Sequence, residues 1–397
     1  MKYPNIPTGE KCPICDSGDV HAFFELSKMP AQDGVVYDSR QAAIDAPVGD
    51  IRLGVCRRCQ YIGNLAYDPD QINFVEYSYS KRHSQQYRDH VEKIVKKLVN
   101  TYAVRNKTVI DVGCGEGYFL HELCNAGENR GVGIDPSLSV ADEIAADSAR
   151  LEFIKDFYSE KYAEHSGDLI CCRHVIDELA EPVEFLRLIL SSVDKNGDGL
   201  VYIELQNALN TFEKKLVWNI GYAKRSWFIP GSLQVLLQTC GLLVLETETL
   251  FGGDYLGIVG RRAMNSVEVP TSSEESLANL LTILEGFAQH FDDEIKRWQS
   301  RISDLRLRGE QMVIWGAGMR GVNFLHHFGD ATIFPMIVDV NSDRQGSYLP
   351  GSGYRIESPE VLATLKPNRI LISNPNYQSE ISAQIEEMGL VCELETL

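Results

Sequence analysis

VIDVGCGEGYFL, at residues 109–120, is followed by VGID at residues 132–135. The first string reads as a buried strand, a turn with three glycines and the start of an amphipathic helix, and the second reads as another strand that ends in an acid. This order predicts an α/β fold with a parallel, doubly wound sheet. Asp135 follows the glycines at roughly the 20-residue spacing that lets a carboxylate reach ribose hydroxyls in such a sheet. The sequence therefore predicts a site for a ligand that carries a ribose.

The spacing of the first glycines favours one such ligand. Asp111, Gly113, Gly115 and Gly117 form the pattern Asp-x-Gly-x-Gly-x-Gly, which differs from the dinucleotide pattern Gly-x-Gly-x-x-Gly. A pyrophosphate favours bare N–H groups at a helix start, whereas an ammonium group favours a carboxylate. S-adenosylmethionine carries an ammonium, a carboxylate, a sulfonium and a ribose, so we expect Asp111 near its amino end and Asp135 on its ribose. The alternative is a glycine turn that only connects strand to helix.

This pattern resembles the first two motifs of class I methyltransferases. On that basis Asp156 and Phe157, which follow a predicted third strand at residues 151–154, are expected to meet the adenine. The acid would accept a hydrogen bond from the adenine amino group, and the ring would stack nearby. For Asp156 the alternative is an ordinary surface acid.

Four cysteines form two pairs with the spacing of a metal site. Cys12 with Cys15, and Cys56 with Cys59, are each Cys-x-x-Cys, which lets two thiolates bind one tetrahedral ion at about 2.3 Å. We expect a structural zinc ion, with strands between the pairs to bring them together. Two unrelated pairs or a redox pair are the alternatives.

Composition limits the possible partners. At 397 residues the chain is expected to form two to three domains, and its 44% apolar and 24% charged residues are typical of a globular protein. A formal charge of −18 argues against nucleic acid as a partner. No apolar stretch approaches the length of a membrane span, and the N-terminal residues lack a signal-peptide core, so we expect a cytoplasmic protein without membrane contact.

The chain divides into four expected parts: a zinc-binding domain at residues 1–80, a methyltransferase domain at 81–265, a helical linker at 266–306 and a second Rossmann-like α/β domain at 307–397. In the second part we expect a helix over 85–99, parallel strands alternating with helices, and an antiparallel pair at 242–247 and 256–261. A polar stretch at 267–275 predicts a hinge before a long helix over 277–306.

The last part repeats the strand–glycine–helix pattern with different spacing. Gly316, Gly318 and Gly321 follow Gly-x-Gly-x-x-Gly, and a second strand ends at Asp339. Alone, this pattern would also fit a nicotinamide cofactor and a dehydrogenase, but a single such motif is weak evidence.

Taken in order, these parts resemble the sugar C-methyltransferases that act on nucleotide-linked deoxysugars. The resemblance covers nearly the whole chain and is strongest at residues 316–325, 338–351, 358–360 and 374–377. It implies that the C-terminal domain closes over a sugar nucleotide, with Gly316, Gly318, Gly321 and Asp339 binding that substrate. Residues 77–79, with Arg88 and His90, resemble the family's tyrosine segment, and HVIDE at 174–178 resembles its His-Val-Leu-Glu-His motif, with Glu178 in place of the second histidine.

One departure from the family concerns the chemistry. Where relatives read Tyr-Glu-His before an aromatic pair, this chain reads YAKRSWFIP at residues 222–230. Tyr222, Trp227 and Phe228 fit, but Ala223 cannot orient a base. Lys224 can act as a base only if burial or a neighbouring cation lowers its pKa toward neutrality.

The implied reaction is carbon methylation next to a ketone, which needs a base for the α-proton and a donor for the enolate oxygen. The resemblance implies Tyr79 and Tyr222 at the sugar, His174 at the cofactor edge of the cleft and Lys224 as a replacement acid or base. The alternatives are packed aromatic rings, a helix-capping histidine and a solvated lysine.

The sequence thus predicts an S-adenosylmethionine-dependent methyltransferase that acts on a nucleotide-activated sugar. Carbon methylation of a keto-deoxysugar is the first choice. Transfer to oxygen or nitrogen of a related sugar is the second, because an acceptor with a lone pair depends less on the missing Glu-His pair. A non-catalytic sugar-nucleotide-binding protein is the third.

Overall fold

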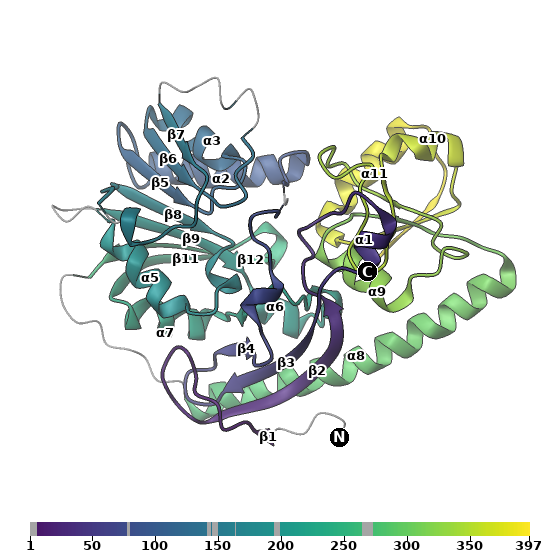
Figure 1. Ribbon diagram of the computed structural model, residues 1–397, viewed down its shortest axis with the longest axis horizontal. Coiled ribbons are helices and arrows are strands. Elements are labelled where there is room, and N and C mark those ends of the chain that lie inside the picture. The colour runs from purple at the N-terminus through teal and green to yellow at the C-terminus, as the bar shows by residue number, and fades with distance from the viewer. Residues whose placement is uncertain are drawn as a thin grey trace.

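The computed structural model describes residues 6–77, 80–140, 144, 150–162, 164–193, 199–263 and 273–397. Its described part contains three sheets and one long helix that runs from the N-terminal sheet toward the C-terminal unit (Figure 1). Within that part, no helix is both long and apolar enough to cross a membrane.

The central sheet has seven strands in the order β11-β12-β9-β8-β5-β6-β7. Five run parallel: β5 (Thr108–Val112), β6 (Arg130–Ile134), β7 (Leu151–Ile154), β8 (Leu169–Arg173) and β9 (Leu200–Gln206). The edge pair β11 (Leu242–Leu250) and β12 (Tyr255–Arg262) is antiparallel. The predicted doubly wound sheet with its antiparallel pair is confirmed.

Helices cover both faces of this sheet because its strands are apolar on both sides. Val109 of β5 belongs to the core that faces α2 (Gln85–Asn100) and α3 (Tyr118–Gly127). The next residue, Ile110, belongs to the core that faces α5 (Pro182–Ser191) and α7 (Pro230–Thr239). Because β5 and β6 run parallel, their carboxyl ends lie at the same edge of the sheet, where ligands bind in such folds.

The N-terminal sheet is antiparallel, in the order β1-β2-β3-β4-β10. Its strands are β1 (Ile6–Pro7), β2 (Val20–Pro30), β3 (Val48–Cys56), β4 (Ile62–Asn64) and β10 (Ser226–Trp227), and helix α1 (Arg40–Ile44) lies between β2 and β3 in the chain. The strand β10 comes from the segment that carries Lys224. The expected division at residue 80 stays a prediction, but this sheet includes a strand from far beyond it.

The C-terminal sheet is wholly parallel, in the order β15-β14-β13-β16-β17, so the second Rossmann-like unit is confirmed. Its elements are β13 (Val313–Trp315), α9 (Met319–Phe328), β14 (Ile337–Val338), β15 (Ile356–Glu357), α10 (Leu362–Leu365), β16 (Arg369–Ile372), α11 (Gln378–Glu387) and β17 (Glu393–Thr396). The short helix α6 (Ala208–Glu213) follows β9. Single 3-10 turns lie at Pro69–Gln71, Glu160–Tyr162, Ile176–Glu178, Val217–Asn219, Phe251–Gly253, Pro359–Val361 and Pro375–Tyr377.

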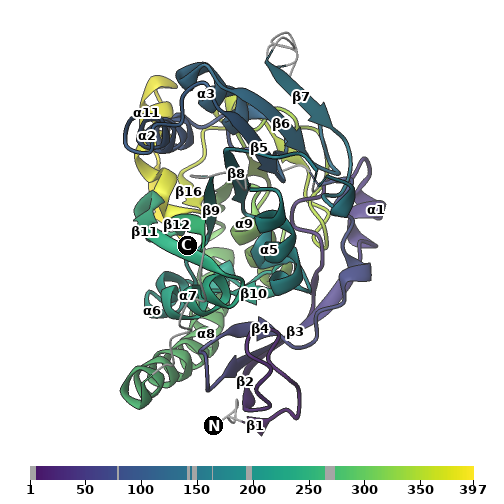
Figure 2. The same cartoon turned by 90° about the vertical axis from the view of Figure 1, so that its left-hand side faces the viewer.

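The long helix α8 (Glu274–Arg308) joins the N-terminal and C-terminal sheets, and Figure 2 shows it on the same side of the central sheet as β2 and β3. Phe287 and Phe291 pack edge-on against Phe24 of β2, with ring centroids 5.5 and 5.1 Å away. Farther along α8, Trp298 packs against Phe324 of α9 at 4.7 Å. Most of the polar stretch predicted as a hinge lies outside the described residues.

Candidate active site

A cavity of about 870 Å³ lies between the N-terminal lobe (residues 6–77), the central sheet and the C-terminal unit. The N-terminal lobe contributes Asp33 and residues 74–77, the glycine turn after β5 contributes residues 111–116, and the C-terminal unit contributes Gly316, Gly318 and Asp339. Its volume is near the upper end of the range for small-molecule sites, about 300–1,000 Å³. The two glycine turns that the sequence singles out therefore open onto one space.

The turn after β5 requires glycine because its backbone is left-handed. The φ angles of Gly113 and Gly117 are +76° and +82°. A Cβ on Gly113 would lie 2.2 Å from a methyl carbon of Val175, and one on Gly117 would lie 2.5 Å from the Phe153 ring. Gly113 and Gly115 line the cavity, whereas Gly117 only starts α3.

Asp111 is suited to an ammonium ligand. The residue is 2% exposed, and its Oδ1 has no hydrogen-bond partner within the described part of the chain. Burial raises the pKa of this carboxyl to about 7; Arg173 opposes the rise and Asp135 adds to it. A buried acceptor without a donor is costly, and a bound ammonium group would supply the missing donor. The residue thus fits the amino end of S-adenosylmethionine, as predicted.

Asp135 braces the same turn. Its Oδ2 accepts a hydrogen bond from the Gly115 N–H at 2.8 Å, and its Oδ1 accepts from the N–H and hydroxyl of Ser137 at 2.7 Å each. The carboxylate lines the cavity. Two oxygens offer about four lone-pair positions, so acceptor capacity remains for ribose hydroxyls.

The C-terminal turn repeats this arrangement. Asp339, at the end of β14, accepts hydrogen bonds from Ala317 N–H at 2.6 Å and Asn341 N–H at 2.8 Å. Gly316 has a φ of +112°, and a Cβ on Gly321 would lie 2.3 Å from the Gly316 carbonyl oxygen. Gly321 therefore lets α9 approach the turn but does not itself line the cavity, whereas Gly318 does.

The four paired cysteines meet in one cluster. The sulfur atoms of Cys12, Cys15, Cys56 and Cys59 all lie within 4.8 Å of one another. Sγ of Cys12 is 3.5 Å from that of Cys59, and Sγ of Cys15 is 3.6 Å from that of Cys56. A tetrahedral zinc ion with 2.3 Å bonds holds its sulfur ligands about 3.8 Å apart, so the cluster fits the predicted ion.

Comparison with known proteins agrees with this geometry. Residues 80–247 match a methyltransferase domain, and residues 258–390 match the C-methyltransferase C-terminal domain. The C-methyltransferase NovU of Streptomyces niveus is 24% identical over 395 residues, covering 94% of this chain and 91% of that protein. The chain is thus similar to a C-methyltransferase over nearly its whole length. It is an S-adenosylmethionine-dependent methyltransferase.

Two further similarities are weaker. The tRNA U34 carboxymethyltransferase of Campylobacter jejuni subsp. jejuni serotype O:23/36 (strain 81-176) is 27% identical over 159 residues, which are 37% of this chain and 51% of that protein. The chain thus matches about half the length of that relative. The crystal structure of magnesium protoporphyrin IX methyltransferase from Synechocystis PCC 6803 shares 17% identity, with coverage of 48% of this chain and 89% of that one. The TM-score of this comparison is 0.37.

The two residues predicted to contact the adenine, Asp156 and Phe157, differ in their position relative to the cavity. Phe157 lines the cavity and is 53% exposed, which suits a stacking surface. Asp156 does not line the cavity, because Tyr162 donates a hydrogen bond to its carboxylate at 2.6 Å and Lys161 forms an ion pair with it. Its predicted contact with the adenine amino group stays untested, but this geometry does not favour it.

His174 lines the cavity as a neutral imidazole. Its Nε2 lies 3.0 Å from Oε1 of Glu204, a fully buried carboxylate that also accepts from Arg173 at 2.9 Å and His90 at 3.1 Å. Burial lowers the pKa of His174 to about 4, although Glu204 opposes the change. His174 therefore donates from Nε2 at neutral pH, and it is a weak base.

Lys224 also lines the cavity, but its surroundings oppose one predicted role. Its ammonium group forms an ion pair with Asp177 and lies 4.0 Å from Oε1 of Glu178. Burial alone would lower the pKa of Lys224, yet the carboxylates of Asp177, Glu178 and Asp33 outweigh it and raise the pKa. The condition for a lysine base is thus not met, and the expectation of a base at this position is corrected. The role as a proton donor stays a prediction.

The two predicted substrate tyrosines have different outcomes. Tyr79 lies outside the described residues. Tyr222 is 1% exposed and absent from the cavity wall. Its ring stacks on Tyr67 at 5.8 Å, and its hydroxyl accepts from the Asp68 N–H at 2.9 Å. We correct its expected contact with the sugar, because it is buried against Tyr67 and Asp68 of the N-terminal part of the chain.

Several charged residues of the cavity wall had no role assigned from the sequence, among them Asp33, Glu178 and Arg344. Of these three, only Glu178 had a signal, as the residue that departs from the family motif. Asp33 and Arg344 lie in loops far apart in the chain, and Arg344 donates to the Asp33 carbonyl oxygen at 3.2 Å. No local pattern marks that pairing.

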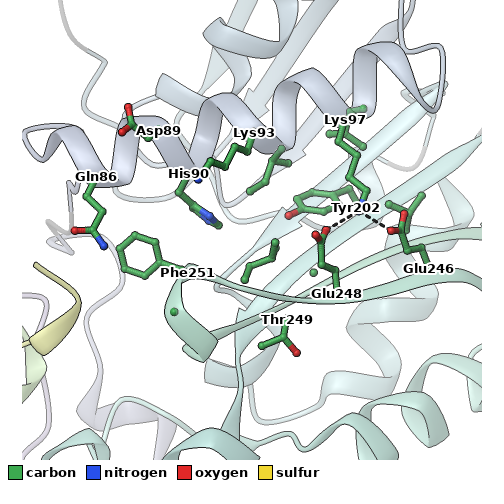
Figure 3. Close-up of a pocket in the computed structure, with 16 residues that line it drawn as sticks. Gln86, Asp89, His90, Lys93, Lys97, Tyr202, Glu246, Glu248, Thr249 and Phe251 are labelled. Atoms are coloured by element: carbon green, nitrogen blue, oxygen red, sulfur yellow. Dashed lines mark hydrogen bonds and ion pairs between the residues drawn. The ribbon is translucent and has the colours of Figure 1, made fainter.

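A second cavity, of about 380 Å³, lies between α2 and the β11–β12 pair (Figure 3). Lys97 of α2 forms ion pairs with Glu246 at 2.6 Å and Glu248 at 2.5 Å in this wall. Of the predicted site residues that the structure describes, none lines it. The larger cavity is therefore the candidate active site.

Proposed function

We propose that this methyltransferase transfers the methyl group of S-adenosylmethionine to a carbon atom of a nucleotide-linked keto-deoxysugar. The observation that carries the proposal is the single cavity between two nucleotide-type glycine turns. One methyl donor needs only one such turn. The second turn supports a second ligand that also carries a nucleoside.

At the first turn, the chain's own groups match the charges of the donor. Asp111 receives the ammonium group, Asp135 receives ribose hydroxyls and Phe157 stacks on the adenine. When bound, S-adenosylmethionine supplies an activated methyl group on sulfur. The residues of this turn orient that group toward the substrate, which lowers the barrier by positioning.

At the second turn, Asp339 would bind the ribose of the sugar nucleotide, with Gly316 and Gly318 allowing close approach of its backbone. The repeated bracing by Asp135 and Asp339 supports this assignment, since both carboxylates are fixed at strand ends in the same way. A diphosphate also needs positive charge. Lys81 and Arg344 line the cavity and supply it in an otherwise acidic chain.

Carbon as the acceptor is supported by the named relative, a C-methyltransferase, and by the matching C-terminal domain. It is also supported by the pairing of an ammonium and a carboxylate at the cavity wall, Lys224 and Glu178. A keto sugar needs both kinds of group, one to stabilise the enolate oxygen and one to remove the α-proton.

Transfer to oxygen or nitrogen is the second candidate. It is favoured by Ala223 and Lys224, because they occupy the positions at which the sugar C-methyltransferases that this chain resembles have a Glu-His pair. An oxygen or nitrogen acceptor already has a lone pair and needs no carbanion.

The test is an assay of purified protein with S-adenosylmethionine and a panel of nucleotide-linked keto-deoxysugars. We expect S-adenosylhomocysteine and a product with a new carbon-bound methyl group, identified by mass spectrometry and NMR. In D₂O without the donor, the α-hydrogen of the sugar should exchange. Turnover without exchange would support a heteroatom acceptor. Binding of both ligands without turnover across the panel would support the non-catalytic alternative.

A further inference from the structure

Glu178 is fixed at the cavity wall by its surroundings. It ends the 3-10 turn Ile176–Glu178, which follows β8, and its side chain is 12% exposed. The Tyr67 hydroxyl donates to its backbone carbonyl oxygen at 2.6 Å, and the Tyr77 hydroxyl lies 3.4 Å from Oε1. Both tyrosines come from the N-terminal lobe. A carboxylate held in this way keeps its position when a substrate binds.

The charges around Glu178 make it a proton acceptor near neutral pH. Burial raises the pKa of its carboxyl to about 8, the ammonium of Lys224 opposes this rise, and the nearby carboxylates of Asp177 and Asp33 add to it. General bases work best when their pKa lies near the working pH. The negatively charged neighbours increase the affinity of this carboxylate for a proton, while Lys224 keeps part of it ionised.

The other acid–base groups of this part of the cavity are less suited to the role. The Nε2–H of His174 donates a hydrogen bond to Glu204, and the low pKa of His174 makes it a weak base. Lys224 is held as an ammonium by three carboxylates. Asp177 is 1% exposed and paired with Lys224. Asp33 is the competitor that most needs a test, since it lines the same cavity and its Oδ1 is buried without a hydrogen-bond partner among the described residues.

We propose that Glu178 is the general base of this enzyme, with the Lys224 ammonium 4.0 Å away as the group that stabilises the enolate oxygen. The inference rests on the proposed function. The C–H bond next to the keto group breaks, its proton goes to the Glu178 carboxylate, and its electron pair forms the enolate. That carbon then attacks the methyl group. A C–C bond forms, the S–C bond breaks with its electrons returning to sulfur, and Glu178 later releases its proton to water.

The decisive measurement is hydrogen–deuterium exchange at the sugar α-carbon in D₂O without the methyl donor, followed by NMR. We expect Glu178→Gln to slow exchange by roughly 100-fold or more, the range for loss of a general base. The affinity for S-adenosylmethionine should change little, because the groups assigned to the donor are Asp111, Asp135 and Phe157. The melting temperature should also change little, because glutamine keeps the size of the side chain and Asp177 remains as the partner of Lys224. The conservative variant Glu178→Asp should restore part of the exchange rate.

A pH profile adds a readout that a merely structural role would not move. The exchange rate of the native enzyme should rise with pH and level off above about pH 8, as the carboxyl loses its proton. This inflection should disappear in Glu178→Gln. The matched variant Asp33→Asn removes one carboxylate charge from the same cluster, and it should slow exchange far less.

Each outcome has a distinct meaning. If the exchange rate of Glu178→Gln stayed within a few-fold of the native rate, the inference would be overturned. If Asp33→Asn lost more of the exchange rate than Glu178→Gln, the base would be Asp33. Both results leave carbon methylation intact. Native enzyme that methylates a sugar without any exchange would instead overturn the carbon acceptor, and the base with it.

Discussion

The hydroxyl oxygen of Tyr61 lies 2.8 Å from the hydroxyl oxygen of Ser226, and both residues are buried. Tyr61 follows the last cysteine of the metal cluster by two positions, and Ser226 follows Lys224 by two positions. Strand β4, which begins directly after Tyr61, pairs with β10, which begins at Ser226, and Arg225 donates to the Asn64 carbonyl oxygen at 2.6 Å. The cysteine cluster and the Lys224 segment are therefore parts of one structural unit.

Loss of the metal should affect catalysis through this unit. We expect one zinc ion per chain, measured by elemental analysis, and a lower melting temperature after removal by a strong chelator, because structural zinc stabilises the fold directly. Methyl transfer should fall with it. Cys59→Ser should act like the chelator, whereas Cys392→Ser, at a half-buried cysteine outside the cluster, should not. Unchanged melting and activity in the metal-free protein would contradict the assignment.

The Tyr61–Ser226 hydrogen bond should contribute measurably to stability. Tyr61→Phe leaves the buried Ser226 hydroxyl without this partner, so we expect a loss of about 1–3 kcal/mol in the free energy of unfolding. Urea titration of the two single variants and of Tyr61→Phe/Ser226→Ala gives the coupling energy. If the effects of the two substitutions simply add, the hydroxyls do not interact in solution.

Binding of the methyl donor should depend on pH through Asp111. The pKa of this carboxyl is raised to about 7, so its carboxylate form, which the ammonium group needs, is present mainly above that pH. The affinity should rise roughly eightfold from pH 6 to pH 7.5, in proportion to the ionised fraction. Calorimetry at both pH values measures this change. In Asp111→Asn the affinity should be lower at both values and no longer rise, and a flat profile in the native protein would remove Asp111 from the site.

The two residues after β7 should differ in their effect on the donor. Phe157→Ala removes the exposed ring at the cavity wall and should weaken binding of S-adenosylmethionine by about tenfold, since aromatic stacking on a base contributes about 1–3 kcal/mol. Asp156→Ala should have a much smaller effect, because Tyr162 and Lys161 hold its carboxylate. An equal loss in both variants would instead support the contact of Asp156 with adenine.

The Lys224–Asp177 pair allows stability and catalysis to be separated. Lys224→Met leaves the buried carboxylate of Asp177 uncompensated, so we expect a loss of about 3–5 kcal/mol in the free energy of unfolding. Lys224→Met/Asp177→Asn should recover most of that stability but not methyl transfer. Thermal unfolding and turnover, measured on the same samples, test both parts. Recovery of activity in the double variant would show that the ammonium group is needed for folding alone.

Features set by short sequence spacing were the most predictable. The glycine turns and the acids at the ends of β5, β6 and β14 follow from local pattern, because strand, turn and helix are adjacent in the chain. The cysteine cluster also follows from spacing. The antiparallel pair β11–β12 and the long helix α8 appear where the apolar patterns predict them.

What depends on distant contacts could not be predicted. The pKa of Lys224 is set by Asp177, Glu178 and Asp33, none of which is its neighbour in sequence. Tyr222 matches a family motif, yet the N-terminal lobe covers it, through Tyr67 and Asp68. The sequence shows which residue types are present and how they are spaced, but tertiary packing decides which of them face the cavity.

The pairing of β4 with β10 also sets an order of events during synthesis. All four cysteines leave the ribosome long before Ser226 and Trp227, so the metal cluster is able to assemble while the edge of β4 is still open. Phe24 stays uncovered for longer still, until Phe287 and Phe291 have been made. The N-terminal sheet thus begins to form early and is covered late, and the nascent chain carries an unfinished sheet until α8 has been made.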